Sequence, residues 1–157
     1  MENRGVRALS GVFLLLLSGC AGPKPVLTPN TPGLISYATQ LQGIPYRFGG
    51  TEPAGGFDCS GFVQHVYAHF GVPLPRTTRA MAESLPQIPL EQCESGDLLF
   101  FHMENKPFSH VGLYLGEGRF IHAPSVQSGG VMISDLKRHF WRERFAGARR
   151  PVPLAGQ

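Results

Sequence analysis

The chain has 157 residues, of which 42% are hydrophobic and 16% are charged, and it contains 20 glycines and 14 prolines. This length allows one compact domain with appendages, and the hydrophobic fraction excludes a wholly disordered chain. No apolar run reaches the about 18 residues of a membrane-spanning helix, which excludes a polytopic membrane protein. Much of the net charge of +3 arises in residues 137–150, where six basic residues accompany Glu143. We interpret this segment as a solvated face with a charged tail, rather than as a nucleic-acid or membrane site.

The first residues have the pattern of an export signal. Arg4 and Arg7 precede the apolar run 8–17, which is too short to span a membrane but suits a secretion signal. The run ends in Leu-Ser-Gly before Cys20, which resembles the signal sequence of bacterial lipoproteins. The resemblance implies that residues 1–19 are removed and that Cys20 receives lipid, which would anchor the protein to a membrane. The alternative is an ordinary signal peptide with an incidental cysteine.

A tether follows the proposed lipidation site. Residues 20–32 contain four prolines and no apolar period, which predicts a semi-extended linker. Ala21 is not acidic, and in a Gram-negative cell this implies sorting to the outer membrane. We therefore expect a cell-envelope protein with one folded domain over residues 33–151 and a short tail at 152–157.

Two cysteines remain for chemistry, Cys59 and Cys93, and a disulfide between them is one reading in an exported protein. The surroundings of Cys59 favour a working thiol. The apolar residues of 62–70 have helical spacing, Asp58 is a suitable N-cap, and Gly71 can end the helix. Cys59 then lies in the first helical turn, where free N–H groups and the helix dipole favour a thiolate.

A thiol nucleophile needs a base, and the base needs an orienting group. His65 and His69 lie further along the same predicted helix, cannot reach back to its start, and are interpreted as surface residues. His110 and His122 instead occur in two strand-like stretches, joined by the glycine-rich loop 116–118.

The register of this hairpin decides whether the two histidines can meet. A two-residue turn would place His110 and His122 on opposite faces of the sheet. A three-residue loop over 116–118 places Gly112 opposite His122 and sets His110 diagonally beside it on the same face, about 7–8 Å away. We therefore predict the three-residue loop, with a glycine in the left-handed region.

Five sequence segments now carry a resemblance. They are similar to segments of the NlpC-type cell-wall peptidases, whose fold is papain-like, and they occur in the same order over about residues 34–149. The resemblance implies an α+β domain with helices packed on a central antiparallel sheet. The segments are Ile44-Pro45-Tyr46-Arg47-Phe48-Gly49-Gly50, Phe57-Asp58-Cys59-Ser60-Gly61-Phe62-Val63, Gly96-Asp97-Leu98-Leu99-Phe100-Phe101, Ser109-His110-Val111-Gly112-Leu113-Tyr114-Leu115-Gly116 and Phe120-Ile121-His122-Ala123.

The resemblance also implies roles for individual residues. Cys59 corresponds to the nucleophile, His110 to the general base, and His122 to the polar group that orients it. Tyr46 corresponds to a tyrosine near the thiol that can assist the oxyanion, although a buried structural ring is an equal alternative. The remaining matches concern the substrate. Asp58 and Ser60 correspond to positions that contact the substrate's free amine, and for Asp58 helix capping explains the residue equally well. Arg76 also fits the family pattern, without an assigned role.

The implied activity is hydrolysis of the peptidoglycan stem peptide between D-glutamate and the following diamino acid. We expect a monomer that uses no cofactor and no metal and binds no nucleic acid. Three alternatives remain open: amidase, transpeptidase or acyltransferase chemistry on the same fold, a non-catalytic wall-binding module, and a zinc site formed by Cys59, His110 and His122.

Overall fold

The computed structural model describes residues 31–151. The predicted signal peptide, the predicted lipidation site Cys20, residues 21–30 of the predicted tether and the tail at 152–157 lie outside the described residues. The last two residues of the predicted tether, Thr31 and Pro32, begin a helix instead. No helix within the described range is long and apolar enough to cross a membrane.

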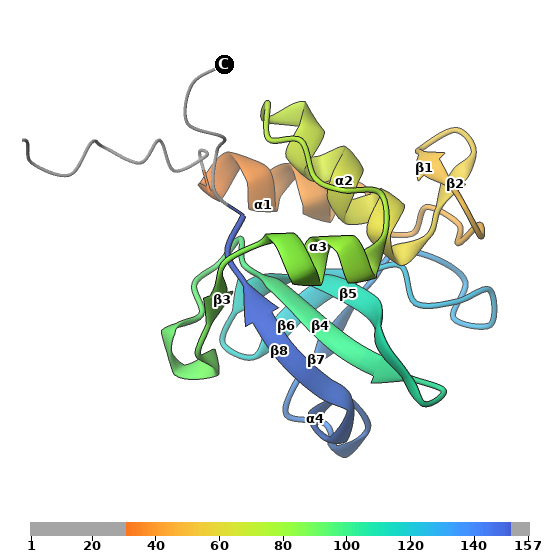
Figure 1. Ribbon diagram of the computed structural model, residues 1–157. Coiled ribbons are helices and arrows are strands. Elements are labelled where there is room, and N and C mark those ends of the chain that lie inside the picture. The colour runs from red at the N-terminus through yellow and green to blue at the C-terminus, as the bar shows by residue number, and fades with distance from the viewer. Residues whose placement is uncertain (1–30, 152–157) are drawn as a thin grey trace, which may run out of the picture.

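The described chain combines helices with an antiparallel sheet, as predicted (Figure 1). The six-stranded sheet has the order β3-β8-β4-β5-β6-β7, and β1 and β2 form a separate small hairpin. The helical elements are α1 (Thr31–Gln40), α2 (Cys59–His69), α3 (Thr78–Ser84), α4 (His139–Arg144) and a 3-10 turn, η1 (Leu90–Gln92). The strands are β1 (Thr51–Glu52), β2 (Gly56–Phe57), β3 (Gln87–Ile88), β4 (Leu98–Met103), β5 (Lys106–Gly116), β6 (Arg119–His122), β7 (Met132–Asp135) and β8 (Phe145–Arg149).

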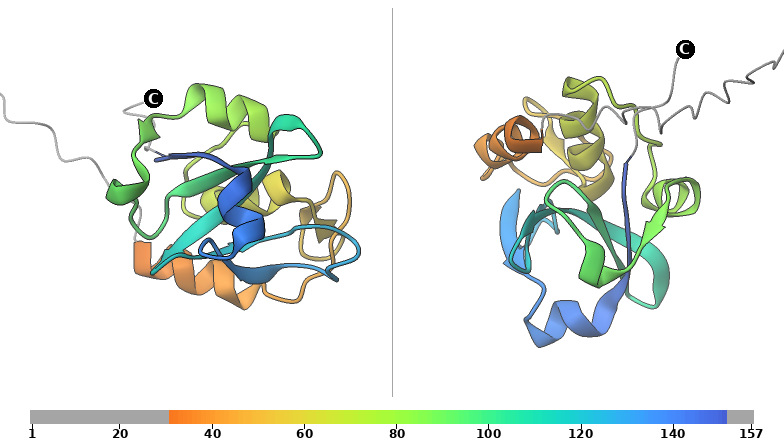
Figure 2. Two further views of the ribbon diagram at one scale, coloured as in Figure 1. Left: turned by 90° about the horizontal axis from the view of Figure 1, so that it is seen from below. Right: turned by 90° about the vertical axis from the view of Figure 1, so that its left-hand side faces the viewer.

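The sheet separates two apolar clusters. Helices α1, α2 and α3 cover one face, and α4 packs against the other (Figure 2). Strand β4 contributes side chains to both clusters, because successive side chains along a strand point to opposite faces of the sheet. Leu98 and Phe100 join the larger cluster under α1–α3, whereas Leu99 and Phe101 join the smaller one with Trp141. Each fully buried side chain of this size contributes about 1.5–3 kcal/mol to folding.

Helix α2 matches its prediction at both ends. Asp58 is the N-cap, and its carboxylate accepts a hydrogen bond from the N–H of Gly61. The helix ends at His69, and Gly71 follows with a φ of 75°. Gly61 is required for packing, because a Cβ there would lie 2.0 Å from the carbonyl oxygen of Gly50. The backbone around residue 50 is therefore held directly against the start of α2.

The basic segment agrees with its prediction only in part. Lys137, Arg138 and Arg142 are exposed, as predicted for a solvated face. The segment is not a tail, however, because it forms α4 and β8, and β8 lies between β3 and β4. Arg149 is buried and donates to the carbonyl of Ala82. Arg150 makes a paired contact with the buried carboxylate of Asp97, at 2.8 and 2.9 Å. These two arginines are structural, because each has a fixed partner inside the fold.

The β5–β6 hairpin has the predicted pairing around the histidines. Leu113 pairs with Ile121 and Tyr114 with Phe120, which is the register expected from the three-residue loop. The turn itself is tighter than predicted. Gly116 pairs with Arg119, so only two residues form the turn, and Leu115 forms a bulge that shifts the register by one. The bulge therefore gives the strands around the histidines the same pairing that the predicted three-residue loop would have given.

Gly112 offers a test of this register. A Cβ at this position would lie 2.6 Å from Cδ2 of the buried Phe120 and 3.3 Å from Cβ of His122. We expect Gly112→Ala to lower the free energy of unfolding by about 1–3 kcal/mol, measured by urea denaturation. The added methyl group would force the buried Phe120 ring to move, which strains the packed core. Gly55→Ala is the matched control, since its nearest neighbour is 3.8 Å away. Equal denaturation midpoints for the two variants would contradict the packing described.

Candidate active site

Cys59 lies where three elements meet. It is the first residue of α2, and its partly buried Sγ lies 3.7 Å from Oγ1 of Thr78 in α3. The backbone N–H of Val111, the residue after His110 in β5, also contacts the thiol. The structure thus brings the thiol to the strand that carries His110.

The two predicted histidines form a continuous hydrogen-bonded chain. Nε2 of His110 lies 2.7 Å from Nδ1 of His122, and Nε2 of His122 lies 2.9 Å from Oγ of Ser134 in β7. Both rings are buried. Because Nε2 of His110 contacts His122, Nδ1 is the ring nitrogen that takes no part in this chain. The predicted pairing on one face of the sheet is confirmed.

Aromatic side chains surround this pair. The Trp141 ring stacks on His110 at 5.7 Å between centroids and meets the edge of His122 at 4.8 Å. Phe101 and Phe120 complete the apolar surroundings. The sequence reading missed Ser134 and Trp141. Trp141 lies in the segment interpreted as a charged tail, and Ser134 lies in a strand for which no motif was found.

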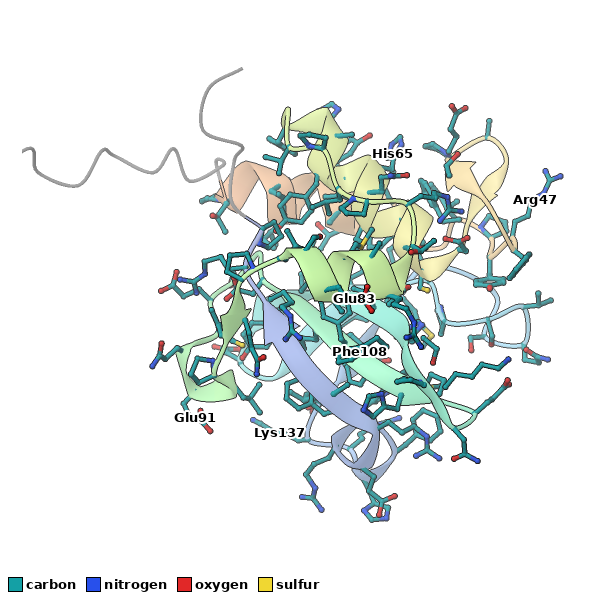
Figure 3. The ribbon with its side chains drawn as sticks, viewed as in Figure 1. Arg47, His65, Glu83, Glu91, Phe108 and Lys137 are labelled. Carbon is teal, nitrogen blue, oxygen red and sulfur yellow. The ribbon has the colours of Figure 1, made fainter. Side chains whose placement is uncertain are left out.

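A backbone irregularity precedes His110. Phe108 has a φ of 49°, which is uncommon for a residue with a side chain, and the β4–β5 pairing shifts between Phe101 and Met103. Figure 3 labels the partly buried Phe108 in the middle of the view, whereas Arg47, Glu91 and Lys137 lie at its periphery. The bulge restores regular pairing at His110, opposite Phe101, which fixes the direction of the imidazole.

Burial keeps the thiol and the imidazoles neutral. Desolvation raises the pKa of the Cys59 thiol, and the hydroxyl of Thr78 and two backbone N–H groups only partly oppose it. The prediction that the helix start favours a thiolate is therefore not met in the resting site, because desolvation is the larger effect. Burial lowers the pKa of His110 to about 4, and burial together with the neighbouring His110 holds the pKa of His122 well below its usual range.

These histidines predict a pH-dependent stability. The ordinary pKa of histidine is 6.5, and that of His110 in the folded protein is about 4. Between these values the unfolded chain binds more protons, so stability is complete above pH 6.5 and is lost as pH falls toward 4. The loss amounts to about 3 kcal/mol. Urea denaturation from pH 7.5 to 4 measures this loss, with His110→Gln expected to flatten the slope. Equal slopes for wild type and His110→Gln would contradict this assignment.

Tyr46, Asp58 and Ser60 lie around the same helix start. Burial raises the pKa of the partly buried Tyr46, and the anionic forms of Cys59 and Asp58 raise it further. Asp58 and Ser60 are buried, and both bond to Arg76. Hydrogen bonds from Arg76, Gly61 and Ser60 outweigh burial and hold the pKa of Asp58 below its usual range.

Two other readings of these residues find no support in the geometry. Cys59 and Cys93 are both free, and the Sγ of Cys93 faces the carbonyl of Pro89. The facing nitrogens of His110 and His122 bond to each other, so they do not point toward one common ion. Within residues 31–151 no three His, Cys, Asp or Glu side chains are arranged to hold a metal.

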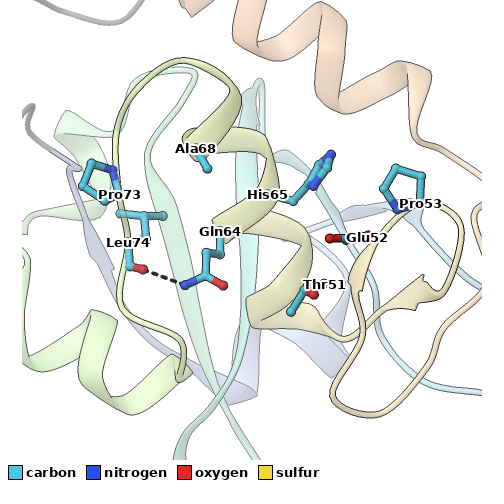
Figure 4. A pocket seen from close by; sticks show the side chains of 8 residues that line it. All are labelled: Thr51, Glu52, Pro53, Gln64, His65, Ala68, Pro73 and Leu74. Atoms are coloured by element: carbon cyan, nitrogen blue, oxygen red, sulfur yellow. Dashed lines mark hydrogen bonds between the residues drawn. The ribbon is translucent and has the colours of Figure 1, made fainter.

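The remaining histidines of α2 lie away from the thiol. His65 is partly buried rather than fully on the surface, because its Nε2 lies 2.9 Å from the hydroxyl of Tyr37 and its ring packs on Phe57. A hollow of about 450 Å³ lies beside it, between α2, Thr51–Pro53 and the Pro73–Leu74 segment (Figure 4). At the edge of this hollow, the side-chain amide of Gln64 donates a hydrogen bond to the carbonyl of Leu74. Cys59 does not line this hollow, so the thiol chemistry lies elsewhere.

Comparison with known proteins shows the relationship directly. A sequence profile of the NlpC/P60 family matches residues 43–150. The bifunctional muramidase/DL-endopeptidase CwlT of Bacillus subtilis is 38% identical over 115 residues, which cover 72% of this chain and 34% of that protein. The murein DD-endopeptidase MepH of Escherichia coli is also 38% identical over 115 residues, covering 71% of this chain and 42% of that protein.

The fold is shared with solved members of this group. The crystal structure of an NlpC/P60 family protein from Bacillus cereus is 34% identical and superimposes with a TM-score of 0.75, covering 82% of this chain and 42% of that one. The expected papain-like α+β fold is thereby confirmed. The chain spans less than half the length of these relatives.

Proposed function

The chain belongs to the NlpC/P60 family, and from this premise we propose that it is a cysteine endopeptidase that hydrolyses the stem peptide of peptidoglycan. The observation that carries the proposal is the arrangement of Cys59 at the start of α2 beside the strand of His110, with His110 bonded to His122. A thiol, a neutral imidazole and an orienting group are the parts that acyl transfer requires.

The proposed reaction starts from the neutral pair. His110 takes the thiol proton at Nδ1 as the sulfur of Cys59 attacks the carbonyl carbon of the scissile bond. The imidazolium then gives this proton to the leaving amine, and a thioester remains on Cys59. A water molecule loses a proton to the same nitrogen and attacks the thioester. The imidazolium then returns this proton to the departing sulfur, so that the acid and the thiol are released.

His122 has an orienting role in this scheme. For Nδ1 of His110 to accept a proton, its Nε2 must carry one, and Nδ1 of His122 accepts that hydrogen bond. Nε2 of His122 then carries the hydrogen that Ser134 accepts. The chain of contacts is compatible with the tautomer that makes His110 a base toward the thiol.

Tyr46, Asp58 and Ser60 complete the proposed site. The phenol of Tyr46 keeps its proton, because its pKa is raised, and can therefore donate to the oxyanion together with the backbone N–H of Cys59. Asp58 and Ser60, which both bond to Arg76, are proposed to contact the substrate at the helix start. No cofactor takes part in this mechanism.

The expected bond joins D-glutamate, through its γ-carboxyl, to the diamino acid. The name of CwlT includes DL-endopeptidase, which supports this choice, whereas that of MepH includes DD-endopeptidase. An amidase, an acyltransferase or a non-catalytic wall-binding protein would use the same fold. The intact hydrogen-bonded set supports catalysis over binding alone, because binding requires neither a thiol nor a selected tautomer.

The proposed location is the cell envelope. Lipid on Cys20 would anchor the protein, and a tether from residue 20 to about residue 30 would carry the domain about 30 Å toward the wall. We propose a monomer that contacts peptidoglycan and, through its lipid, a membrane. The strongly basic segment does not require a nucleic-acid partner, because Arg149 and Arg150 are engaged within the fold.

Defined muropeptides test the function. The soluble chain from residue 21 is incubated under reducing conditions with tripeptide, tetrapeptide and crosslinked tetrapeptide muropeptides, and the products are identified by mass spectrometry. Release of a product that begins with the diamino acid supports the proposed bond. Cleavage only within the crosslink would replace it with the DD bond, and products joined to an added amine would indicate acyl transfer. Absence of any product from the folded protein would overturn the proposed function.

A further inference from the structure

The hydroxyl of Thr78 lies within hydrogen-bonding reach of the sulfur of Cys59. Thr78 is the first residue of α3, and its Oγ1 is 3.7 Å from Sγ. The residue is buried, with 7% of its surface exposed. The same sulfur also receives the backbone N–H groups of Ser60 in α2 and Val111 in β5. Three elements, α2, α3 and β5, thus each direct one polar group at the sulfur.

The start of α3 is held by a different hydroxyl. Thr77 is the N-cap, and its Oγ1 accepts the backbone N–H three residues later at 3.2 Å. A threonine within a helix commonly bonds to the carbonyl four residues before it. For Thr78 this is the carbonyl of Leu74, which lies outside the helix and already accepts a hydrogen bond from Gln64 at 2.8 Å. The contact with the sulfur is therefore not a by-product of helix capping.

A hydroxyl can serve the sulfur in both of its protonation states. In the proposed reaction the sulfur becomes negatively charged as His110 takes its proton, and it does so where burial disfavours charge. The two backbone N–H groups can only donate. The Thr78 hydroxyl can accept a hydrogen bond from the neutral thiol and, after rotating, donate one to the thiolate. It is the one of these three groups that suits both states.

The ionisable groups near the sulfur act in opposite directions. The carboxylate of Asp58 disfavours a thiolate, whereas the guanidinium of Arg76 attracts it. The two groups form an ion pair at 2.6 Å, so their effects on the sulfur oppose each other. Tyr46 keeps its proton, because burial raises its pKa, and His110 on β5 becomes a cation only after it has taken the proton. Uncharged donors thus have a distinct part in holding the charged sulfur.

We propose that Thr78 is a positioning residue, whose hydroxyl accepts from the thiol of Cys59, donates to its thiolate, and so aligns the sulfur for attack. It acts through Cys59 and does not contact the substrate. The catalytic consequence rests on the proposed endopeptidase function. The hydrogen bond itself belongs to the site and can be measured without any peptidoglycan substrate.

Alkylation of the thiol tests the hydrogen bond directly. Thr78→Val keeps the shape of the side chain and removes the hydroxyl, whereas Thr78→Ser retains it. The rate of alkylation of Cys59 by iodoacetamide is followed by peptide mass spectrometry from pH 7 to 11 in the full chain. A hydrogen bond to a charged group corresponds to about a tenfold change or more, so we expect the midpoint to rise by about one pH unit in Thr78→Val. Thr78→Ser is expected to follow the wild-type profile. Superimposed profiles of wild type and Thr78→Val would overturn the inference.

Kinetics with a muropeptide separate positioning from substrate binding. We expect Thr78→Val to lower kcat by about tenfold at unchanged KM, and Thr78→Ser to restore it. A raised KM with unchanged kcat would show that Thr78 contacts the substrate, and would overturn the inference. So would equal losses in the valine and serine variants, because these would trace to packing.

Thr77→Ala is the matched control. Thr77 is exposed, and the substitution removes the cap of α3 without touching the sulfur. We expect wild-type alkylation and kcat for the folded variant, whose fold is checked by circular dichroism. Equal changes in Thr77→Ala and Thr78→Val would assign the effect to a loosened α3 and contradict the proposal. If the wild-type protein cleaves no muropeptide, the proposed function fails, while the alkylation profiles still decide whether Thr78 holds the thiolate.

Discussion

Replacement of Cys59 by alanine is expected to abolish hydrolysis, with kcat lower by at least about 10⁴-fold, because it removes the thiol on which the proposed acyl intermediate forms. The fold should persist. The sulfur makes one side-chain contact, with Thr78 at 3.7 Å, and the cap by Asp58 that starts α2 does not involve it. Steady-state kinetics with a muropeptide measure the loss, and circular dichroism checks the fold.

Cys93→Ala is the matched control for this prediction. Cys93 is free and partly buried, and lies near Pro89, so its removal should leave kcat unchanged. Loss of activity in Cys93→Ala with retention in Cys59→Ala would contradict the site assignment. The raised pKa of the Cys59 thiol adds a second readout: alkylation by iodoacetamide should be slow at pH 7 and should accelerate above pH 9. Fast alkylation at pH 6 would show a preformed thiolate instead.

The histidine chain predicts effects that decrease with distance from the thiol. His110→Gln should lower kcat by at least about 10³-fold, since it removes the group that moves the proton. His122→Leu should lower it by about 10²-fold, because the tautomer of His110 is then no longer selected. Ser134→Ala should lower kcat by less than about tenfold, because Ser134 acts on His110 only through His122. Single-turnover kinetics at pH 7 measure all three.

His122→Asn separates orientation from simple packing. The amide oxygen of asparagine can accept the hydrogen bond from Nε2 of His110, which leucine cannot. We therefore expect His122→Asn to recover most of the activity that His122→Leu loses, at similar thermal stability. Equal activity in the two variants would show that His122 serves only to fill space against Trp141.

Much of the site was accessible from the sequence because its signals are local. The cap residue Asp58, the helical spacing after it and the terminal Gly71 determine α2 within a short stretch of chain. The hairpin places His110 and His122 by register alone, since both residues belong to adjacent strands. The exact turn was missed, because a bulge at Leu115 and a longer loop give the same pairing at the histidines.

The missed features depend on distant contacts. Trp141 and Ser134 reach the histidines from α4 and β7, and nothing in their own segments marks them. Arg149 and Arg150 were read as solvated because charge usually lies at the surface, yet Ala82 and Asp97 provide partners far along the chain. The state of the thiol was also misjudged, because the helix start is visible in the sequence and the desolvation around it is not.

The acyl-enzyme is the species that tests this account most directly. Wild-type protein mixed with muramyl tripeptide is quenched in acid within milliseconds, digested, and analysed by mass spectrometry. The account predicts a thioester on Cys59 whose added mass equals muramyl-alanyl-glutamyl, with free diamino acid as the first product. Product formation without any adduct on Cys59, or an adduct that contains the diamino acid, would contradict it.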